Sequence, residues 1–412
     1  MKKSIFKGTA IGVTMALLIA SCSDQEDQII DIDNTSFETE ESIVSQSSQI
    51  IEGSYIIVFN QKVTGDIGAK FGNDHKAARL AVQSAAEKMF VENKVGAYEI
   101  SNSYSKVFNG ISSKLTKEDV TKLKTDKRVA YIEKDQMITL APPPGKGPGN
   151  GGGGSDPQET PWGIARVNGG VPYTGTNVAW ILDTGIDLDH PDLNVDASIG
   201  FNAFSSGKDG RSLDDGNGHG SHVAGTIAAI NNDIGVIGVA PGAKVIPVKV
   251  LDSRGSGSYS GVIAGIDYVA ANGSNGDVAN MSLGGPVSQA VDDAVSAAAQ
   301  NGIKFVLAAG NDSDDANNHS PARVNGNNIY TISAMNSNDG WASFSNFGNP
   351  PVDYCAPGVA IKSTWKDGGY NTINGTSMAA PHAAGVLLLG NASASGTVNG
   401  DPDGSPDTII SH

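Results

Sequence analysis

Three segments of this 412-residue chain each place one reactive side chain at the end or the beginning of a predicted element. Asp183 follows the apolar run 178–182, while His219 and Ser377 each open a predicted helix. An acid that leaves a buried strand must be paired, because it would otherwise take up a proton. The first turn of a helix has outward-pointing N–H groups and favours negative charge. A carboxylate, an imidazole and a hydroxyl are therefore candidates for acid–base and nucleophilic chemistry.

Each of these signals is weak when taken alone. Asp183 could cap a turn, a single histidine is more often structural, and a serine at a helix start is usually an N-cap. Taken together, in the order Asp, His, Ser, the motifs DTG (183–185), GHGSHVAGT (218–226) and GTSMAAPH (375–382) resemble those of the subtilisin-type serine peptidases. The resemblance covers residues 158–412.

The resemblance implies a role for each matching residue. Ser377 is the expected nucleophile, His219 is the general base and later the acid, and Asp183 orients the imidazole and stabilises the imidazolium. AAGN (308–311) matches the family's oxyanion segment, so the Asn311 amide and the Ser377 N–H are the expected donors. The residues expected to bind an extended peptide substrate are Ser282, Leu283, Gly284, Ala308, Ala309, Gly310 and, as a lid, Tyr259.

The resemblance also implies a structural Ca²⁺ site, because Ca²⁺ takes six to eight oxygen ligands. Gln158 lies four residues before Trp162, and Asp192 lies nine residues after Asp183, as the family pattern requires. The loop 230–236 follows the histidine helix; alternatively, its two asparagines form only a turn. The implied ligands are Gln158, Asp192, Ile230, Asn232, Ile234 and Val236.

Apolar strand-like runs alternate with helical runs in residues 158–412. This alternation predicts an α/β fold with a mostly parallel sheet covered by helices on both faces, in which ligands bind at the carboxyl ends of the strands. After residue 389 the family's usual closing helix is missing, and either disorder or another covering of the sheet edge fits. The expected strands are 177–182, 244–251, 278–282, 304–309 and 329–334, and the expected helices are 218–229, 260–271, 288–301 and 376–389.

Residues 52–140 form a second predicted unit, which is small and ferredoxin-like. It has 14 basic and 11 acidic side chains, whereas residues 158–412 have 10 basic and 24 acidic ones. By the same resemblance it is an inhibitor-type propeptide that acts as chaperone and inhibitor, with residues 137–140 lying in the cleft like a product strand. Its expected strands are 55–59, 107–111, 129–132 and 137–140, and its expected helices are 75–94 and about 117–124.

The N-terminus has the pattern of an export signal. A basic start precedes an apolar run, 8–20, that is too short to span a membrane. The sequence LIASC (18–22) resembles a bacterial lipobox with Cys22 as the lipidated residue; the alternative is an ordinary signal peptide. We therefore expect a signal peptide at 1–21, an acidic tether at 22–51 and a cleavable linker at 141–157. The precursor would be membrane-anchored, and the mature enzyme extracellular or at the cell surface.

The composition argues against several classes of protein. A net charge of −16 argues against nucleic acid as the main partner, and two cysteines exclude a disulfide framework or a Cys-rich metal site. The first hypothesis is a lipid-tethered, self-processing endopeptidase. The second is a non-catalytic surface lipoprotein that binds peptides with a degenerate peptidase fold, and the intact set Asp183, His219, Asn311 and Ser377 argues against it. The third is a serine esterase. The esterases usually carry G-x-S-x-G and the order Ser-Asp-His, which this chain lacks around Ser377.

Overall fold

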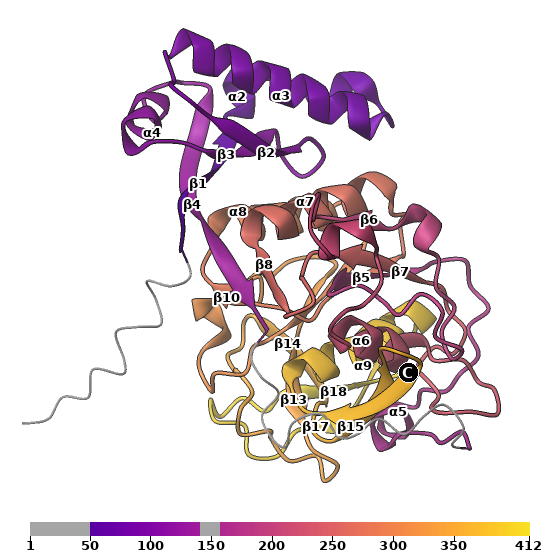
Figure 1. Cartoon of the computed structure of the whole chain (residues 1–412). Helices are drawn as coiled ribbons and strands as arrows, with labels where there is room; N and C mark the ends of the chain where they lie inside the picture. Colours follow the sequence, from indigo (N-terminus) through magenta and orange to yellow (C-terminus); the bar gives the residue numbers. More distant parts are fainter. Residues whose placement is uncertain (1–49, 141–156) are drawn as a thin grey trace, which may run out of the picture. The chain divides into compact units, whose positions relative to one another are not determined.

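The computed structural model describes residues 50–140 and 157–412 (Figure 1). The expectations for the signal peptide, for Cys22, for most of the tether and for the linker up to residue 156 therefore lie outside the described residues. Within the described ranges, no helix has both the length and the apolar character needed to cross a membrane.

The first described domain is a ferredoxin-like unit with the chain order β-α-β-β-α-β. Its strands are hydrogen-bonded in the order β2-β3-β1-β4, and all neighbours are antiparallel. Thr116 caps helix α4 (Lys117–Leu123), since its side chain accepts from Asp119 N. The elements are β1 (Ile50–Phe59), α2 (Gln61–Thr64), α3 (His75–Glu92), β2 (Glu99–Tyr104), β3 (Gly110–Lys114), α4 (Lys117–Leu123) and β4 (Val129–Thr139).

Four details of this domain differ from the sequence prediction. The sequence does not predict strand β2, because this polar segment shows little apolar alternation and buries only its last two residues. The strand expected at 107–111 begins at Gly110. Residues 129–139 form one long strand rather than two, and β1 begins at Ile50, two residues before the expected domain boundary.

The second domain is built on a nine-stranded sheet with the order β17-β18-β14-β13-β11-β9-β5-β7-β6. Every neighbouring pair is parallel except β17 with β18. The five predicted strands are all present, which confirms the predicted α/β class. The strands are β5 (Ala179–Asp183), β6 (Phe201–Asn202), β7 (Val245–Lys249), β9 (Val278–Met281), β11 (Lys304–Ala308), β13 (Ile329–Met335), β14 (Val352–Pro357), β17 (Ser393–Thr397) and β18 (Thr408–Ser411).

Helices cover both faces of this sheet, and each face has its own core. Successive side chains of a strand point to opposite faces. In β5, Ala179 and Ile181 pack into one apolar cluster, and Trp180 and Leu182 pack into the other. The first cluster contains helices α6 (His219–Ala228) and α9 (Thr376–Leu389), and the second contains α7 (Tyr259–Asn272) and α8 (Gln289–Ala299).

The smaller elements complete the second domain. Helix α5 (Trp162–Arg166) precedes β5. Two short ribbons lie outside the main sheet: β10 (Gly285–Pro286) pairs with β12 (His319–Ser320), and β15 (Ile361–Trp365) pairs with β16 (Gly369–Ile373). Strand β8 (Ser256–Ser258) pairs with the last residues of β4 and so extends the propeptide sheet to five strands.

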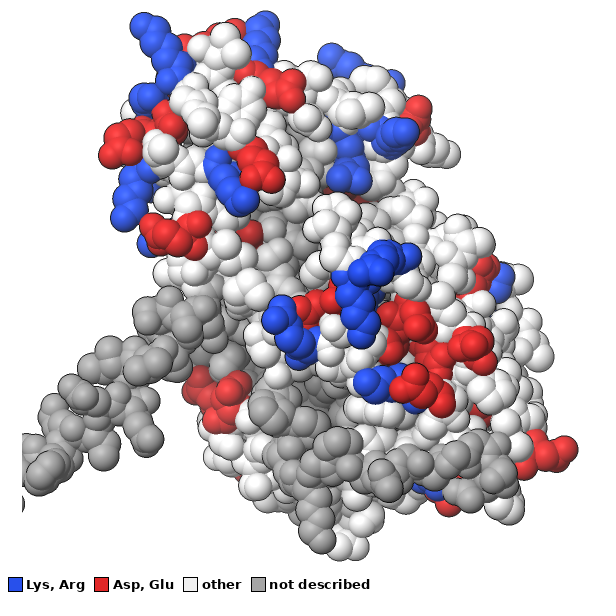
Figure 2. Space-filling view, in the orientation of Figure 1, with Lys and Arg blue, Asp and Glu red and all other residues white. Residues whose placement is uncertain are grey.

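The segment after residue 389 forms an edge of the sheet rather than a helix. Strand β18 pairs in parallel with β14, and β17 turns back along β18. Of the two alternatives left open by the sequence, this structure corresponds to another covering of the sheet edge. In the view of Figure 2, acidic and basic side chains are interspersed over the propeptide domain, while much of the second domain's surface is uncharged.

Candidate active site

The carboxylate of Asp183 and the imidazole of His219 are in direct contact. Asp183 is the last residue of β5 and His219 the first of α6, and Nδ1 of His219 lies 2.8 Å and 2.9 Å from the two carboxylate oxygens. Asp183 is fully buried and His219 is 7% exposed. The pairing therefore meets the requirement, stated from the sequence, that an acid at the end of this strand has a partner.

Small residues allow helix α6 to approach the Asp183 loop this closely. A Cβ placed on Gly220 would lie 2.1 Å from the carbonyl oxygen of Gly185 and 3.2 Å from Cβ of Asp183. Gly185 itself has φ +105°, a conformation that side chains rarely adopt. Because neither position leaves room for a side chain, the two glycines set the distance between the carboxylate and the imidazole.

Two opposing effects act on the pKa of His219. Burial lowers it, because a charged imidazolium loses its hydration. The charge of Asp183, the hydrogen bond to Asp183 and the charge of Asp215 raise it, and their sum prevails, so the pKa of His219 lies above its usual value. The site thus stabilises the protonated imidazole, which is the state that a general base must pass through.

Ser377 lies in the first turn of α9, beside the carboxyl ends of β9 and β11. Its hydroxyl donates to the carbonyl oxygen of Ser282 at 3.2 Å, and the Ser282 hydroxyl donates to the carbonyl oxygen of Ser377 at 2.7 Å. Among the contacts of the described residues, the Ser377 hydroxyl bonds to Ser282 and not to His219. A nucleophile and its base often align only once a substrate is bound. This geometry therefore agrees with Ser377 as nucleophile and His219 as base.

Asn311 is held at the start of the same helix. Its Oδ1 accepts from the Thr376 backbone N–H at 2.8 Å and from the Thr376 hydroxyl at 3.0 Å. Because the side-chain oxygen is occupied in this way, the amide NH₂ is the end that remains to donate. The structure thus places the Asn311 amide and the first turn of α9 together.

A cleft of about 870 Å³ opens on Ser377. Strands β9 and β11 are parallel neighbours with Met281 opposite Leu307, so the segments that follow both strands reach the same edge of the sheet. The structure brings together six of the seven expected substrate residues with Asn311 and Ser377 in the lining of this cleft: Ser282, Leu283, Gly284, Ala308, Ala309 and Gly310.

The seventh, Tyr259, is buried beside the cleft rather than in its lining. Its hydroxyl donates to the carbonyl oxygen of Pro286 at 2.6 Å, and it packs in the same apolar cluster as Ile138 of the propeptide. Strand β4 pairs antiparallel with β8, with Ile138 opposite Gly257, and Leu140 N donates to the carbonyl oxygen of Gly255 at 2.9 Å. The end of the propeptide therefore occupies the cleft as an added strand.

The six expected calcium ligands also come together. Nε2 of Gln158 lies 2.7 Å from the carbonyl oxygen of Ile230 and 3.3–3.4 Å from Asn232 Oδ1 and the carbonyl oxygens of Ile234 and Val236. Asp192 accepts from the Asn232 amide at 3.0 Å and from Val236 N at 3.2 Å. Four oxygens thus converge on one electropositive group, which is the arrangement that a cation needs.

This cluster contains only one carboxylate. The described residues include no group of three or more His, Cys, Asp or Glu side chains suited to a metal. A site built mainly from backbone carbonyls and side-chain amides does not have that signature. It suits a hard cation such as Ca²⁺ rather than a transition metal.

Three further histidines and the cysteine of residues 157–412 lie in the interior or at its border. His222 bonds to the carbonyl oxygen of Ile361 and His382 to that of Met378. Burial lowers the pKa of His222 to about 3 and that of His382 to about 4. His319 lies 3.2 Å from Asp314, and Cys355 is a free, fully buried thiol whose pKa burial raises.

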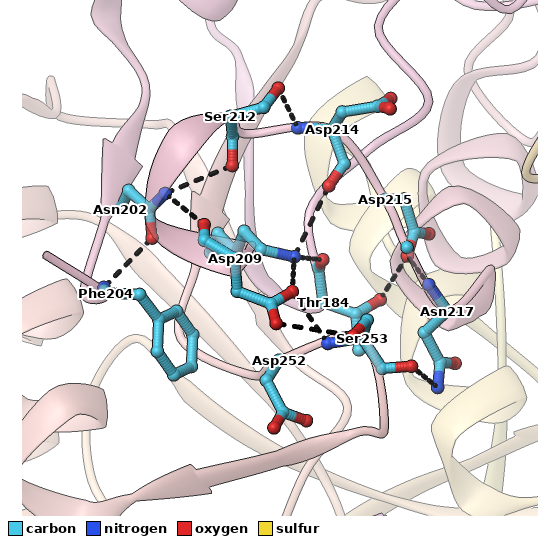
Figure 3. A network of polar contacts seen from close by, with 12 residues as sticks. Thr184, Asn202, Phe204, Asp209, Ser212, Asp214, Asp215, Asn217, Asp252 and Ser253 are labelled. Atoms are coloured by element: carbon cyan, nitrogen blue, oxygen red, sulfur yellow. Dashed lines mark hydrogen bonds and ion pairs between the residues drawn. The ribbon is translucent and has the colours of Figure 1, made fainter. Parts of the chain in front are cut away.

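Sequence reasoning missed several buried charges around the site. Figure 3 shows Asp215 bonded to Thr184. The buried ammonium of Lys249 donates to the carbonyl oxygens of Thr184 and Asp214 and lies 3.5 Å from Asp209. Asp215 lies four residues before His219, which is too far from the helix start for the N-cap pattern to identify it. Lys249 gave no signal, because a lysine at the end of a strand normally points to solvent.

Three further carboxylates, of which Asp135 and Asp267 are buried and Glu133 is half-buried, join the propeptide to the second domain. Asp267 of α7 accepts from the backbone N–H groups of residues 105–107 at 2.7–3.0 Å and contacts His75 at 2.7 Å. From the propeptide side, Asp135 accepts from Ser260 N and Oγ, and Glu133 accepts from Ser288 Oγ and Ala290 N. These contacts cannot be predicted from either domain's sequence by itself.

Comparison with known proteins agrees with this geometry. A profile of the subtilase family matches residues 174–398, and one of the peptidase inhibitor I9 group matches residues 54–141. The chain is 41% identical over 357 residues to alkaline serine exoprotease A of Vibrio alginolyticus, which covers 82% of this chain and 60% of that protein. It is 39% identical over 323 residues to subtilisin E of Bacillus subtilis (strain 168), covering 76% of this chain and 78% of that protein.

A solved structure shows the same fold. The crystal structure of a cold-adapted subtilisin-like serine proteinase superposes with a TM-score of 0.51 at 40% sequence identity. It covers 60% of this chain, and the match extends over 96% of that structure. The matched share of this chain corresponds in length to the second domain, residues 157–412.

Proposed function

Because the chain belongs to the subtilase family of serine peptidases, we propose that it is an exported, self-processing endopeptidase whose triad is Asp183, His219 and Ser377. The observation that carries this proposal is the buried contact between Asp183 and His219, with Ser377 in the first turn of α9. In the proposed reaction His219 takes the proton of the Ser377 hydroxyl as it attacks the scissile carbonyl, and then donates it to the leaving amine.

The developing oxyanion needs donors that are already in place. The Asn311 NH₂ and the Ser377 backbone N–H are the proposed pair, supported by the bond that holds Asn311 Oδ1 to Thr376. The segments 282–284 and 308–310 would bind the substrate as an extended strand, mostly through main-chain hydrogen bonds. Tyr259 would wall a more distant part of the cleft.

Residues 52–140 are proposed to serve as inhibitor and intramolecular chaperone. The match to the peptidase inhibitor I9 group and the pairing of β4 with β8 support this role. We place the linker at 141–157 and the peptidase domain at 158–412. Cleavage within the linker by the enzyme itself would leave the propeptide bound as a product until it dissociates.

The cluster around Gln158 is proposed as a structural Ca²⁺ site. When bound, the ion would join the segment before β5 to the loop after α6 and so stabilise the folded state. Gln158 would turn its amide so that Oε1 faces the ion. Asp192, the Asn232 side chain and the carbonyls of Ile230, Ile234 and Val236 would supply the other oxygens.

Differential scanning calorimetry of the mature enzyme tests the calcium proposal. At a Ca²⁺ concentration about 100 times Kd the folded state gains about 2.7 kcal/mol, so the melting temperature should rise by several degrees over that in a chelator. Gln158→Ala should remove most of that difference. Equal melting temperatures with and without Ca²⁺ would refute the site.

We also propose that Cys22 is lipidated and anchors the precursor at a membrane. The lipobox-like sequence LIASC (18–22) is the support. Because the linker lies between Cys22 and the peptidase domain, self-cleavage would free the mature enzyme to the extracellular medium or the cell surface. Two acyl chains would hold the precursor firmly, since each buried CH₂ contributes about 0.8 kcal/mol.

Fractionation of cells that express the full chain, with Ser377→Ala as the inactive variant, tests activity and anchor separately. The wild type should yield a mature-sized soluble product, and Ser377→Ala only the uncut precursor with the membranes. Linker cleavage that persists in Ser377→Ala would overturn the self-processing peptidase. An uncut Ser377→Ala precursor in the soluble fraction would overturn the anchor alone, and the double variant Cys22→Ala with Ser377→Ala should produce that result by design.

A further inference from the structure

Asp215 is a buried carboxylate that connects the Asp183 loop to the helix that carries His219. It is 4% exposed and precedes α6 by four residues. Its Oδ1 accepts from the Thr184 hydroxyl at 2.8 Å, and Thr184 directly follows Asp183 (Figure 3). The same oxygen accepts from the backbone N–H groups of Asn217 at 2.9 Å and Gly218 at 2.8 Å.

The second carboxylate oxygen holds the first turn of α6. It accepts from Ser221 N at 2.9 Å and from the Ser221 hydroxyl at 2.7 Å. The N-cap position itself is Gly218, with φ +114° and no side chain to cap the helix. Asp215 therefore supplies the acceptor that the N-cap residue lacks, at the turn from which His219 projects.

Thr184 is fixed from its other side as well. Its hydroxyl accepts from Gly220 N at 3.0 Å, and its carbonyl oxygen accepts from the buried ammonium of Lys249. Thr184 N donates to Asp183 Oδ1 at 2.7 Å. A continuous set of hydrogen bonds thus runs from the Asp183 carboxylate through Thr184 to Asp215 and the His219 turn.

We propose that Asp215 is a positioning residue for His219: it fixes the spacing between the Asp183 loop and the first turn of α6 and places a second negative charge behind the imidazole. This role rests on the proposed function of His219 as general base. A charge that is rigidly held near the imidazolium stabilises it in the transition state without reorganising during the reaction. In agreement, the charge of Asp215 is one of the factors that raise the pKa of His219.

The other charged groups around this turn have partners of their own that do not involve the Asp215 carboxylate. Asp183 stays on His219 Nδ1, and Lys249 stays on the Thr184 carbonyl with Asp209 3.5 Å away. Asp187 accepts from Gly368 N, while its own N–H donates to Ser221 Oγ. His222 within α6 and His382 of α9 are neutral above about pH 4, because burial lowers both pKa values.

The test compares Asp215→Asn with Asp214→Asn in the mature enzyme released from the full chain. Asp214 is the neighbouring acid, it is exposed, and its carboxylate makes one long contact with Leu188 N at 3.4 Å. Active sites are counted with a covalent serine reagent, and kcat and KM are measured across pH on one peptide substrate. Loss of the Asp215 charge lowers the pKa of His219, so the acidic limb of kcat/KM should move to lower pH.

We expect Asp215→Asn to lower kcat about 10- to 100-fold with little change in KM, and to move the acidic limb down by about half a pH unit. Asp214→Asn should match the wild type. Loosening of the helix alone would lower kcat without moving the limb, so an unmoved limb or an unchanged kcat overturns the proposal. A wild type with no activity in this assay would instead refute the proposed function.

A second pair of variants keeps the inference testable if Asp215→Asn does not fold. Thr184→Val removes the hydroxyl between the Asp183 loop and Asp215, whereas Thr184→Ser keeps it. We expect Thr184→Val to lower kcat several-fold at unchanged KM, and Thr184→Ser to retain activity. Equal kcat values for the two variants would contradict the proposed link through Asp215.

Discussion

The N-termini of helices α6 and α9 present the same kind of backbone N–H donors, but these donors differ in what they bind. At α6 the buried carboxylate of Asp215 accepts from Gly218 N and Ser221 N. At α9 only the neutral amide oxygen of Asn311 accepts from Thr376 N. Both helix ends favour negative charge. The first is occupied by the permanent charge of Asp215 beside the proposed base, and the second has no carboxylate, which leaves it for a charge that would exist only during the proposed reaction.

Helices α7 and α8 show an intermediate case. Their N-termini receive carboxylates from the propeptide, Asp135 at Ser260 and Glu133 at Ala290. Burial raises the pKa of both carboxyl groups, so their desolvation opposes the gain from these hydrogen bonds. A helix end that is filled by a separate domain can be emptied again. The three cases differ in how long the negative charge stays.

Asn311→Asp would make α9 resemble α6 and should have the largest effect. It removes the proposed oxyanion donor and adds a charge that repels the oxyanion. Loss of the Asn donor alone costs about 10²–10³ in kcat, a value measured on a subtilisin, and the added charge should increase that cost. Steady-state kinetics on titrated active sites measure it, with Asn317→Asp on the exposed loop as control. A kcat within tenfold of the wild type would contradict the comparison.

Asp135→Ala would remove the propeptide carboxylate from the N-terminus of α7. It leaves Ser260 N and Oγ without their acceptor in the propeptide complex, at a cost of about 1–3 kcal/mol. The propeptide should then dissociate about tenfold faster after the linker is cut. The delay between linker cleavage on a gel and full activity in solution measures this. Glu118→Ala, an exposed acid of the same domain, should leave the delay unchanged.

Asp353→Asn tests a half-buried carboxylate that has no helix end to support it. Burial raises the pKa of Asp353 to about 6 against one backbone donor, Thr331 N. The folded pKa lies above the unfolded value, so the stability contributed by the protonated form is complete below about pH 4 and is lost as pH rises through 6.

The Asp353→Asn variant should therefore be more stable than the wild type by about 1 kcal/mol at pH 8 and show no gain at pH 4. Urea unfolding of the inactive Ser377→Ala protein at both pH values measures the difference without self-digestion. A gain of the same size at both pH values would assign the effect to packing rather than to charge.

The sequence predicts the frame of this molecule better than its polar interior. Five strands and four helices of the second domain follow from apolar runs of the right length, because each strand is buried on both faces. Glycines in GHGSHVAGT (218–226) predict close packing, and Gly220 fulfils that prediction. Strand β2 escapes because its polar residues show no clear period of two.

The charges behind the site could not be predicted in the same way. Lys249 and Asp209 lie 40 residues apart, and Asp135 and Ser260 lie in different domains. Their pairing depends on how the elements pack, which no local pattern records. The proposed calcium cluster was predictable only because its members keep fixed distances from recognisable motifs. The sequence left two alternatives for the segment that forms the C-terminal strands, because its small polar residues are compatible both with an edge strand and with a loop.

The C-terminal edge of the second domain contains a natural probe of its own opening rate. Cys355 of β14 pairs with Ile409 of β18 and is fully buried among Met335, Val398 and Ile409. It is the single cysteine of residues 157–412. A thiol reagent can reach it only when β18 detaches, so the rate of labelling reports how often this edge opens, without any engineered probe.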